Sequence, residues 1–98
     1  MTQNEIIEAI RAERERQVIL HPMVARKMLP YWASEKTLNV AAEGIKEINN
    51  LDEKENNSNW YTVFIEELYE TFSETDPAKI KEEAIQLAAL CVRLCETL

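Results

Sequence analysis

The segment 76–98 contains the pattern that most limits what this chain can fold into. Asp76-Pro77 is followed by apolar residues that lie alternately four and three positions apart. They are Ile80, Ala84, Leu87, Cys91, Leu94 and Leu98. This spacing places one apolar stripe along one face of a helix. Asp caps a helix and Pro fits its first position, so the segment predicts a helix with a defined start.

A first helix is predicted near the beginning of the chain. It starts at Thr2 or Asn4, because Thr2 and Glu5 have the spacing of a capping box. His21-Pro22 predicts its end or a kink, since a residue before proline avoids the helical conformation.

The segment between the first and second helices has the weakest pattern. Val24, Met28 and Leu29 are compatible with one short helix, and a proline before Tyr31 breaks any longer one. Tyr31 and Trp32 are candidates for stacking on a nucleotide base, but such aromatic residues more often anchor a core. We expect them in the core.

A second helix is predicted from Ser34 or Glu35 to about Asn49. Its apolar stripe comprises Leu38, Ala41, Ile45 and Ile48. Gly44 inside this helix lowers its stability and indicates close packing against a neighbour.

A polar loop is predicted from Asn49 to Asn59, followed by a third helix. Ser58 or Asn59 caps this helix, which runs to about Ser73. Its apolar stripe comprises Trp60, Phe64, Leu68 and Phe72. Only three or four residues separate the third and fourth helices, so we expect them to pack as antiparallel neighbours.

Composition favours helices throughout a single domain, residues 1–98. One glycine and three prolines leave few turn residues, and alternating β-branched runs are absent. Hydrophobic residues make up 46% of the chain, enough for a modest core. The prediction is an all-α fold resembling a four-helix bundle. The apolar stripes exceed what four short helices bury, so we expect a homo-oligomer, either a dimer or a tetramer.

Charge and cysteine content narrow the classes of partner. The net charge is −7, and the basic residues are scattered, which argues against a nucleic-acid partner. No apolar run reaches membrane-spanning length, and the first twenty residues lack a signal-peptide pattern. Cys91 and Cys95 are expected to be buried small hydrophobic residues in a reducing compartment. A cytoplasmic protein without a membrane partner is expected.

Two pairs of polar residues on the last two helices carry the candidate chemistry. They are Glu67 with Glu70, and Glu83 with Gln86. A spacing of three puts each pair on one helix face, and the pairs occupy equivalent edges of the two apolar stripes. Glu66 and Glu82 point further toward solvent by the same angular count. Oxygen clusters of this kind bind hard divalent cations, although such charge runs are more often solvated surface.

These motifs resemble those of a known family. The chain has Trp60, then Glu-Glu-Leu-Tyr-Glu at 66–70, then Glu-Glu-Ala-Ile-Gln at 82–86. It also has Glu-Arg-Glu-Arg-Gln at 13–17. This combination resembles the all-α NTP pyrophosphohydrolase superfamily, the MazG-like proteins, and above all its short, often phage-encoded members. The resemblance spans 60–98 and, more weakly, 13–17.

The resemblance implies a reaction, a cofactor and residue roles. Members hydrolyse the α–β phosphate bond of a nucleoside triphosphate, releasing a monophosphate and pyrophosphate. It implies Mg²⁺ ligands at Glu67, Glu70 and Glu83, with Gln86 at the fourth motif position. It implies that Glu66 or Glu82 acts as the base. It also implies that Arg14, Arg16 and Gln17 contact the phosphates or the nucleotide base of the substrate.

The sequence also departs from the superfamily pattern. Gln86 replaces an Asp, which removes a charge, and Tyr69 stands where a small residue is common. Residues 18–59 carry no motif of the family. We therefore consider two alternative functions. The first is a Mg²⁺-dependent nucleoside triphosphate pyrophosphohydrolase or a degenerate relative, and the alternative is a non-catalytic helical binding module. A phage-encoded inhibitor of a host factor exemplifies the second.

Overall fold

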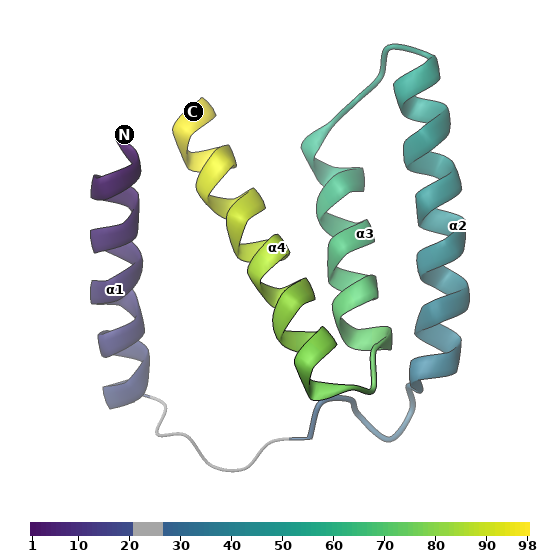
Figure 1. Cartoon of the computed structure of the whole chain (residues 1–98), viewed down its shortest axis with the longest axis horizontal. Helices are drawn as coiled ribbons and strands as arrows, with labels where there is room; N and C mark the ends of the chain where they lie inside the picture. Colours follow the sequence, from purple (N-terminus) through teal and green to yellow (C-terminus); the bar gives the residue numbers. More distant parts are fainter. Residues whose placement is uncertain (21–26) are drawn as a thin grey trace.

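The computed structural model describes residues 1–20 and 27–98, and it contains four helices and no strand within those residues (Figure 1). The helices are α1 (Gln3–Leu20), α2 (Glu35–Lys54), α3 (Trp60–Ser73) and α4 (Pro77–Thr97). The predicted all-α, four-helix fold is confirmed. In the described residues, no helix combines the length and apolar character that a membrane crossing requires. The predictions for His21, Pro22 and Val24 lie outside the described residues.

The helix starts follow the predicted caps. The Thr2 N–H donates to Glu5 Oε1 at 2.9 Å, and the Glu5 N–H donates to Thr2 Oγ1 at 3.2 Å. Ser34, Asn59 and Asp76 cap the other three helices by accepting a backbone N–H two or three residues further on. Because these interactions are local, the sequence alone identifies them.

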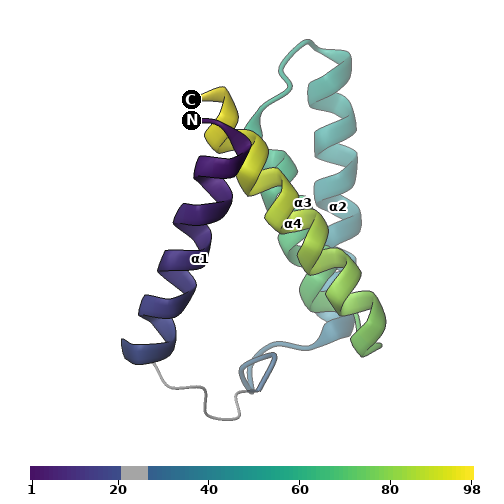
Figure 2. The same ribbon diagram turned by 60° about the vertical axis from the view of Figure 1, so that its left-hand side comes forward.

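The helices α2, α3 and α4 lie side by side, with α3 in the middle (Figure 1). Residues 74–76 join α3 to α4, which run antiparallel as predicted. The helix α1 contacts α4 but neither α2 nor α3. Figure 2 shows α1 and α4 meeting near the two chain ends and diverging from there.

The helix α2 is longer than the sequence pattern predicted. It continues through the polar segment after Asn49 as far as Lys54, so the prediction of a loop from Asn49 is wrong. The reason is a contact with α3, since the half-buried Asp52 accepts hydrogen bonds from Thr62 Oγ1 and from Asn59 Nδ2, each at 3.2 Å. Asn49 and Asp52 thus occupy the inner face of α2, and Ile48 is exposed.

Gly44 lies in the middle of α2 and does not mark close packing. A β-carbon built at this position meets no atom of the described residues within 4 Å. Gly is less favourable than Ala in a helix interior. We therefore expect Gly44→Ala to raise the free energy of unfolding by about 0.5–1 kcal/mol. Thermal and urea denaturation followed by circular dichroism measure this change. An unfolding midpoint of Gly44→Ala below that of the wild-type chain would contradict the finding that a β-carbon fits at this position.

The buried core is thin. Among the described residues, only Ile6 and Ala42 are buried apolar side chains, and Thr62 and Thr71 are buried polar ones. Large apolar side chains are exposed on all four helices.

Two expectations about the core are wrong. Tyr31 and Trp32 are 99% and 76% exposed, because the segment 27–34 forms no helix that packs them against the rest. Cys91 and Cys95 are free and exposed, because α3 covers only one side of α4 and Cys95 borders an open hollow between α1 and α4.

Candidate metal centre

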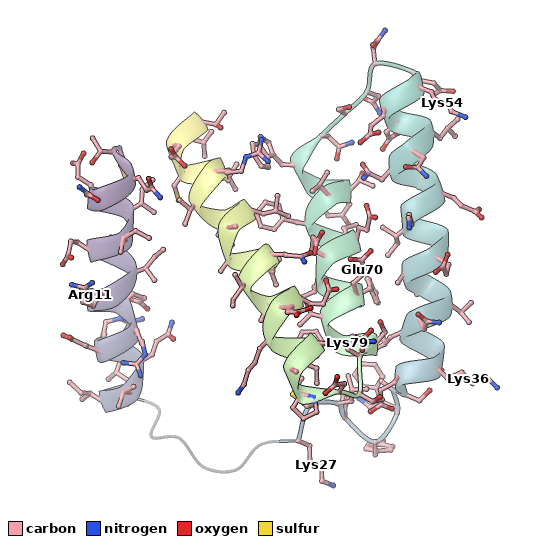
Figure 3. The ribbon with its side chains drawn as sticks, in the orientation of Figure 1. Arg11, Lys27, Lys36, Lys54, Glu70 and Lys79 are labelled. Carbon is pink, nitrogen blue, oxygen red and sulfur yellow. The ribbon has the colours of Figure 1, made fainter. Side chains whose placement is uncertain are left out.

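Three carboxylates converge between α3 and α4, as the sequence predicted. Glu67 and Glu70 lie one turn apart on α3, and Glu83 faces them from α4. One oxygen from each of these side chains lies within 4.8 Å of the other two. Figure 3 labels Glu70 on α3, in the layer of α2, α3 and α4. We call Glu67, Glu70 and Glu83 the carboxylate cluster.

Two oxygens of the carboxylate cluster have no hydrogen-bond donor. Glu67 Oε2 and Glu83 Oε2 are buried, and neither has a partner among the described residues. A buried acceptor without a donor is unfavourable, more so when it carries charge. The cluster is therefore destabilising in the chain alone and suited to a cationic ligand.

The electrostatics of the carboxylate cluster agree with this geometry. Burial raises the pKa of Glu67, and the charges of Glu83 and Glu66 raise it further. Burial and then the charge of Glu67 raise the pKa of Glu70 to about 7, although the Lys46 ammonium on α2 opposes this shift. Both carboxyls hold a proton more tightly than usual, because burial disfavours the charged form and the neighbouring negative charges disfavour it further.

The helix α2 supplies a neighbour that the sequence pattern did not identify. Asn49 Nδ2 donates a hydrogen bond of 2.8 Å to Glu66 Oε2, across the α2–α3 interface. Asn49 Oδ1 is buried without a partner among the described residues. Glu66 is half-buried and faces α2, so the expectation that it points further toward solvent is wrong. The angular count placed Glu66 relative to its own helix but not relative to α2.

A sequence signal for Asn49 exists in retrospect. Asn49 lies four residues after Ile45 and seven after Ala42, which are inward-facing positions of α2. A polar residue at a core-facing position needs a hydrogen-bond partner. The sequence does not indicate that Lys46 lies near Glu70, because lysines are common on the exposed faces of amphipathic helices.

The other predicted residues of the last two helices lie at the edge of this region. Glu82 is exposed beside Glu83, as the angular count predicted. Gln86 is exposed one turn further along α4. The structure thus brings together the three motif carboxylates and leaves the Gln86 side chain open to solvent.

The predicted phosphate-binding residues lie on α1, away from the carboxylate cluster. Arg14, Arg16 and Gln17 are exposed, and α4 lies between α1 and α3 (Figure 1). Arg16 donates two hydrogen bonds to Glu13, and Gln17 Nε2 donates a third at 3.3 Å. One chain does not bring these side chains and the cluster together.

The carboxylate cluster fits a small divalent cation. Mg²⁺ binds oxygens at about 2.1 Å, so two of its ligands lie at most about 4.2 Å apart. Neighbouring ligands of an octahedral ion lie about 3 Å apart, so the three oxygens, which lie within 4.8 Å of one another, must move closer by side-chain rotation to bind the ion. Mg²⁺ also retains waters or binds substrate phosphates, so three protein carboxylates are enough.

Comparison of the chain with protein-family models, curated proteins and solved structures finds no match. The function is therefore inferred from the carboxylate cluster and the motifs that form it.

Proposed function

We propose that this protein is a Mg²⁺-dependent nucleoside triphosphate pyrophosphohydrolase, or a degenerate relative of one. It would hydrolyse a nucleoside triphosphate to the monophosphate and pyrophosphate. One observation carries the proposal: buried oxygens of Glu67 and Glu83 lack a hydrogen-bond donor within a cluster of three carboxylates. The resemblance of the motifs at 60–98 to MazG-like proteins supports the choice of reaction.

The carboxylate cluster has a defined role in this proposal. Glu67, Glu70 and Glu83 would hold Mg²⁺, which neutralises triphosphate charge and orients water when bound. Gln86 offers one neutral oxygen at most, so this site has one charge fewer than the superfamily pattern. Weaker binding of the cation follows from that difference.

Glu66 is the better candidate for the general base. Its carboxylate is fixed by Asn49 and lies close enough to the cluster to raise the pKa of both Glu67 and Glu70. In this role it would accept a proton from water as the water oxygen bonds to the α-phosphorus and the bond from that phosphorus to the bridging oxygen breaks, so that this oxygen leaves with pyrophosphate. Glu82 is exposed and has no fixed orientation from a hydrogen bond among the described residues, so we assign it no step.

The second candidate function is a helical protein-binding module without catalysis, such as a phage-encoded inhibitor of a host factor. The almost fully exposed Tyr31 and the neighbouring Trp32 favour it. Aromatic side chains of this kind are enriched at protein interfaces. A binding role would leave the carboxylate cluster without a function, so we rank it second.

The proposal is tested by incubating the protein with Mg²⁺ and a panel of ribo- and deoxyribonucleoside triphosphates, with pyrophosphate as the readout. We expect Mg²⁺-dependent release that EDTA stops, together with a Mg²⁺-dependent rise in melting temperature. A melting temperature that Mg²⁺ leaves unchanged, with no turnover of any substrate, would reject the enzyme. A Mg²⁺-dependent rise without turnover would support the degenerate relative.

A further inference from the structure

A hollow of about 250 Å³ lies where α2 ends and α3 begins, and it receives side chains from α2, α3 and α4. Pockets for drug-sized ligands measure about 300–1,000 Å³, so this hollow suits one ring system of a larger ligand. We call it the Trp60 hollow. The residues that give it its chemistry are Asn49 and Glu53 from α2, Trp60 and Val63 from α3, and Leu90 and Arg93 from α4.

The Trp60 hollow continues from the carboxylate cluster along the interface between α3 and α4. Trp60 lies seven residues before Glu67, and Leu90 lies seven residues after Glu83. Seven residues make two helical turns, so each pair shares one helix face at a separation of about 10 Å. Because α3 and α4 are antiparallel, both steps lead toward the end of the layer at which α2 also stops (Figure 1). One extended ligand can therefore contact the cluster and the hollow together.

Asn49 gives the Trp60 hollow a hydrogen-bond acceptor that lacks a donor. The Asn49 side chain lines the hollow, and Glu66 sets its orientation. An ionised carboxylate only accepts hydrogen bonds, so Asn49 Nδ2 faces Glu66, and Oδ1 is left without a partner among the described residues. A ligand N–H at this oxygen would supply the missing bond. Because Oδ1 is closed to water in the free chain, binding requires a small rotation of the amide.

The other walls of the hollow select an uncharged, planar group. Trp60, Val63 and Leu90 are half-buried and present aromatic and aliphatic surface. Glu53 and Arg93 carry opposite charges, so the hollow has no net positive charge with which to hold a phosphate. Aromatic side chains stack on nucleobases. An uncharged planar ring with an N–H donor at its edge, such as a nucleobase, meets all three requirements.

We propose that the Trp60 hollow holds the base of the nucleoside triphosphate and favours a base with an exocyclic amino group. This inference rests on the proposed function, in which the carboxylate cluster holds the phosphates through Mg²⁺. The amino group of cytosine would donate to Asn49 Oδ1, whereas uracil carries a carbonyl oxygen at the same ring position. With uracil, two acceptors would face each other and Asn49 Oδ1 would stay unpaired, which disfavours that substrate.

Pyrophosphate release from CTP and UTP in Mg²⁺ tests the selection, because these two substrates differ at that ring position. We expect kcat/KM to be at least about tenfold higher for CTP. Asn49→Ala should bring the ratio of the two values close to one. Loss of the Asn49 contact with Glu66 would slow both substrates alike, so the ratio reports recognition of the base. The matched control is Asn50→Ala, an exposed neighbour on α2, which should keep the wild-type ratio.

Trp60 fluorescence tests binding without turnover and does not require the Asn49 variant to fold. A Trp32→Phe chain has Trp60 as its one tryptophan. In Mg²⁺, a non-hydrolysable α,β-methylene analogue of CTP should quench Trp60 at a concentration at least about tenfold lower than the UTP analogue. Quenching without turnover of any triphosphate supports the hollow and rejects the reaction. Turnover with equal kcat/KM for CTP and UTP overturns the hollow and retains the reaction. Trp60 fluorescence that neither analogue changes also overturns the hollow.

Discussion

Glu83→Gln is expected to abolish Mg²⁺-dependent pyrophosphate release, with kcat/KM lowered at least about 100-fold. Glu83 is the cluster's carboxylate from α4, and its buried Oε2 has no other partner among the described residues. Changes even in the outer shell of a metal site cost roughly 10- to 100-fold in affinity or activity. Loss of a ligand's charge should therefore exceed that range.

The measurement is pyrophosphate release at a series of Mg²⁺ concentrations. Glu96→Gln is the matched control, because Glu96 is an exposed glutamate on the same helix. Its activity should equal that of the wild-type chain. If Glu83→Gln retained wild-type activity at limiting Mg²⁺, the carboxylate cluster would not be the metal site. Unchanged helicity by circular dichroism separates loss of the ligand from loss of the fold.

The metal-free protein is expected to be more stable at pH 5 than at pH 8. The pKa of Glu70 is about 7 in the folded chain, whereas its ordinary value is 4.5. Between those values the folded state binds a proton that the unfolded state has lost. Stability therefore falls as the pH rises through this window and levels off above pH 7. Because Glu70 is only half-buried, solvent screening reduces the expected difference to about 1–2 kcal/mol.

Glu70→Gln isolates this contribution. The amide does not titrate, so the variant should be more stable than wild type at pH 8 and nearly equal to it at pH 5. Urea denaturation at several pH values measures the difference, with Glu43→Gln on the exposed side of α2 as the control. Parallel pH profiles for wild type and Glu70→Gln would contradict the raised pKa. Added Mg²⁺ should reverse the wild-type trend, because the cation competes with protons for the same oxygens.

Local features of the fold could be predicted from the sequence. Thr2 with Glu5, and Asp76 with Pro77, act over two or three residues, so their spacing is sufficient to locate the helix starts. The meeting of Glu67, Glu70 and Glu83 also followed, because a connection of three residues forces α3 and α4 to be antiparallel neighbours.

What could not be predicted depends on contacts between distant residues. The sequence pattern predicts the end of α2 at about Asn49, whereas the helix continues to Lys54 because Asn49 and Asp52 form hydrogen bonds with residues of α3. The angular count does not predict that Glu66 faces α2 for the same reason, since its partner Asn49 lies on that helix. The exposure of Cys91 has another cause, since the periodicity of a helix identifies its apolar face without identifying what covers it.

Because α1 is attached at one end only, the molecule contains two units that can unfold separately. The helix α3 contacts both α2 and α4, whereas α1 contacts α4 alone, near the chain ends. Local opening of α1 therefore need not disturb the rest, and its backbone amides belong to a separate unit of hydrogen exchange. A ligand between α3 and α4 would slow hydrogen exchange in α2, α3 and α4 alone. Binding at the carboxylate cluster and the local opening of α1 can therefore change independently of each other.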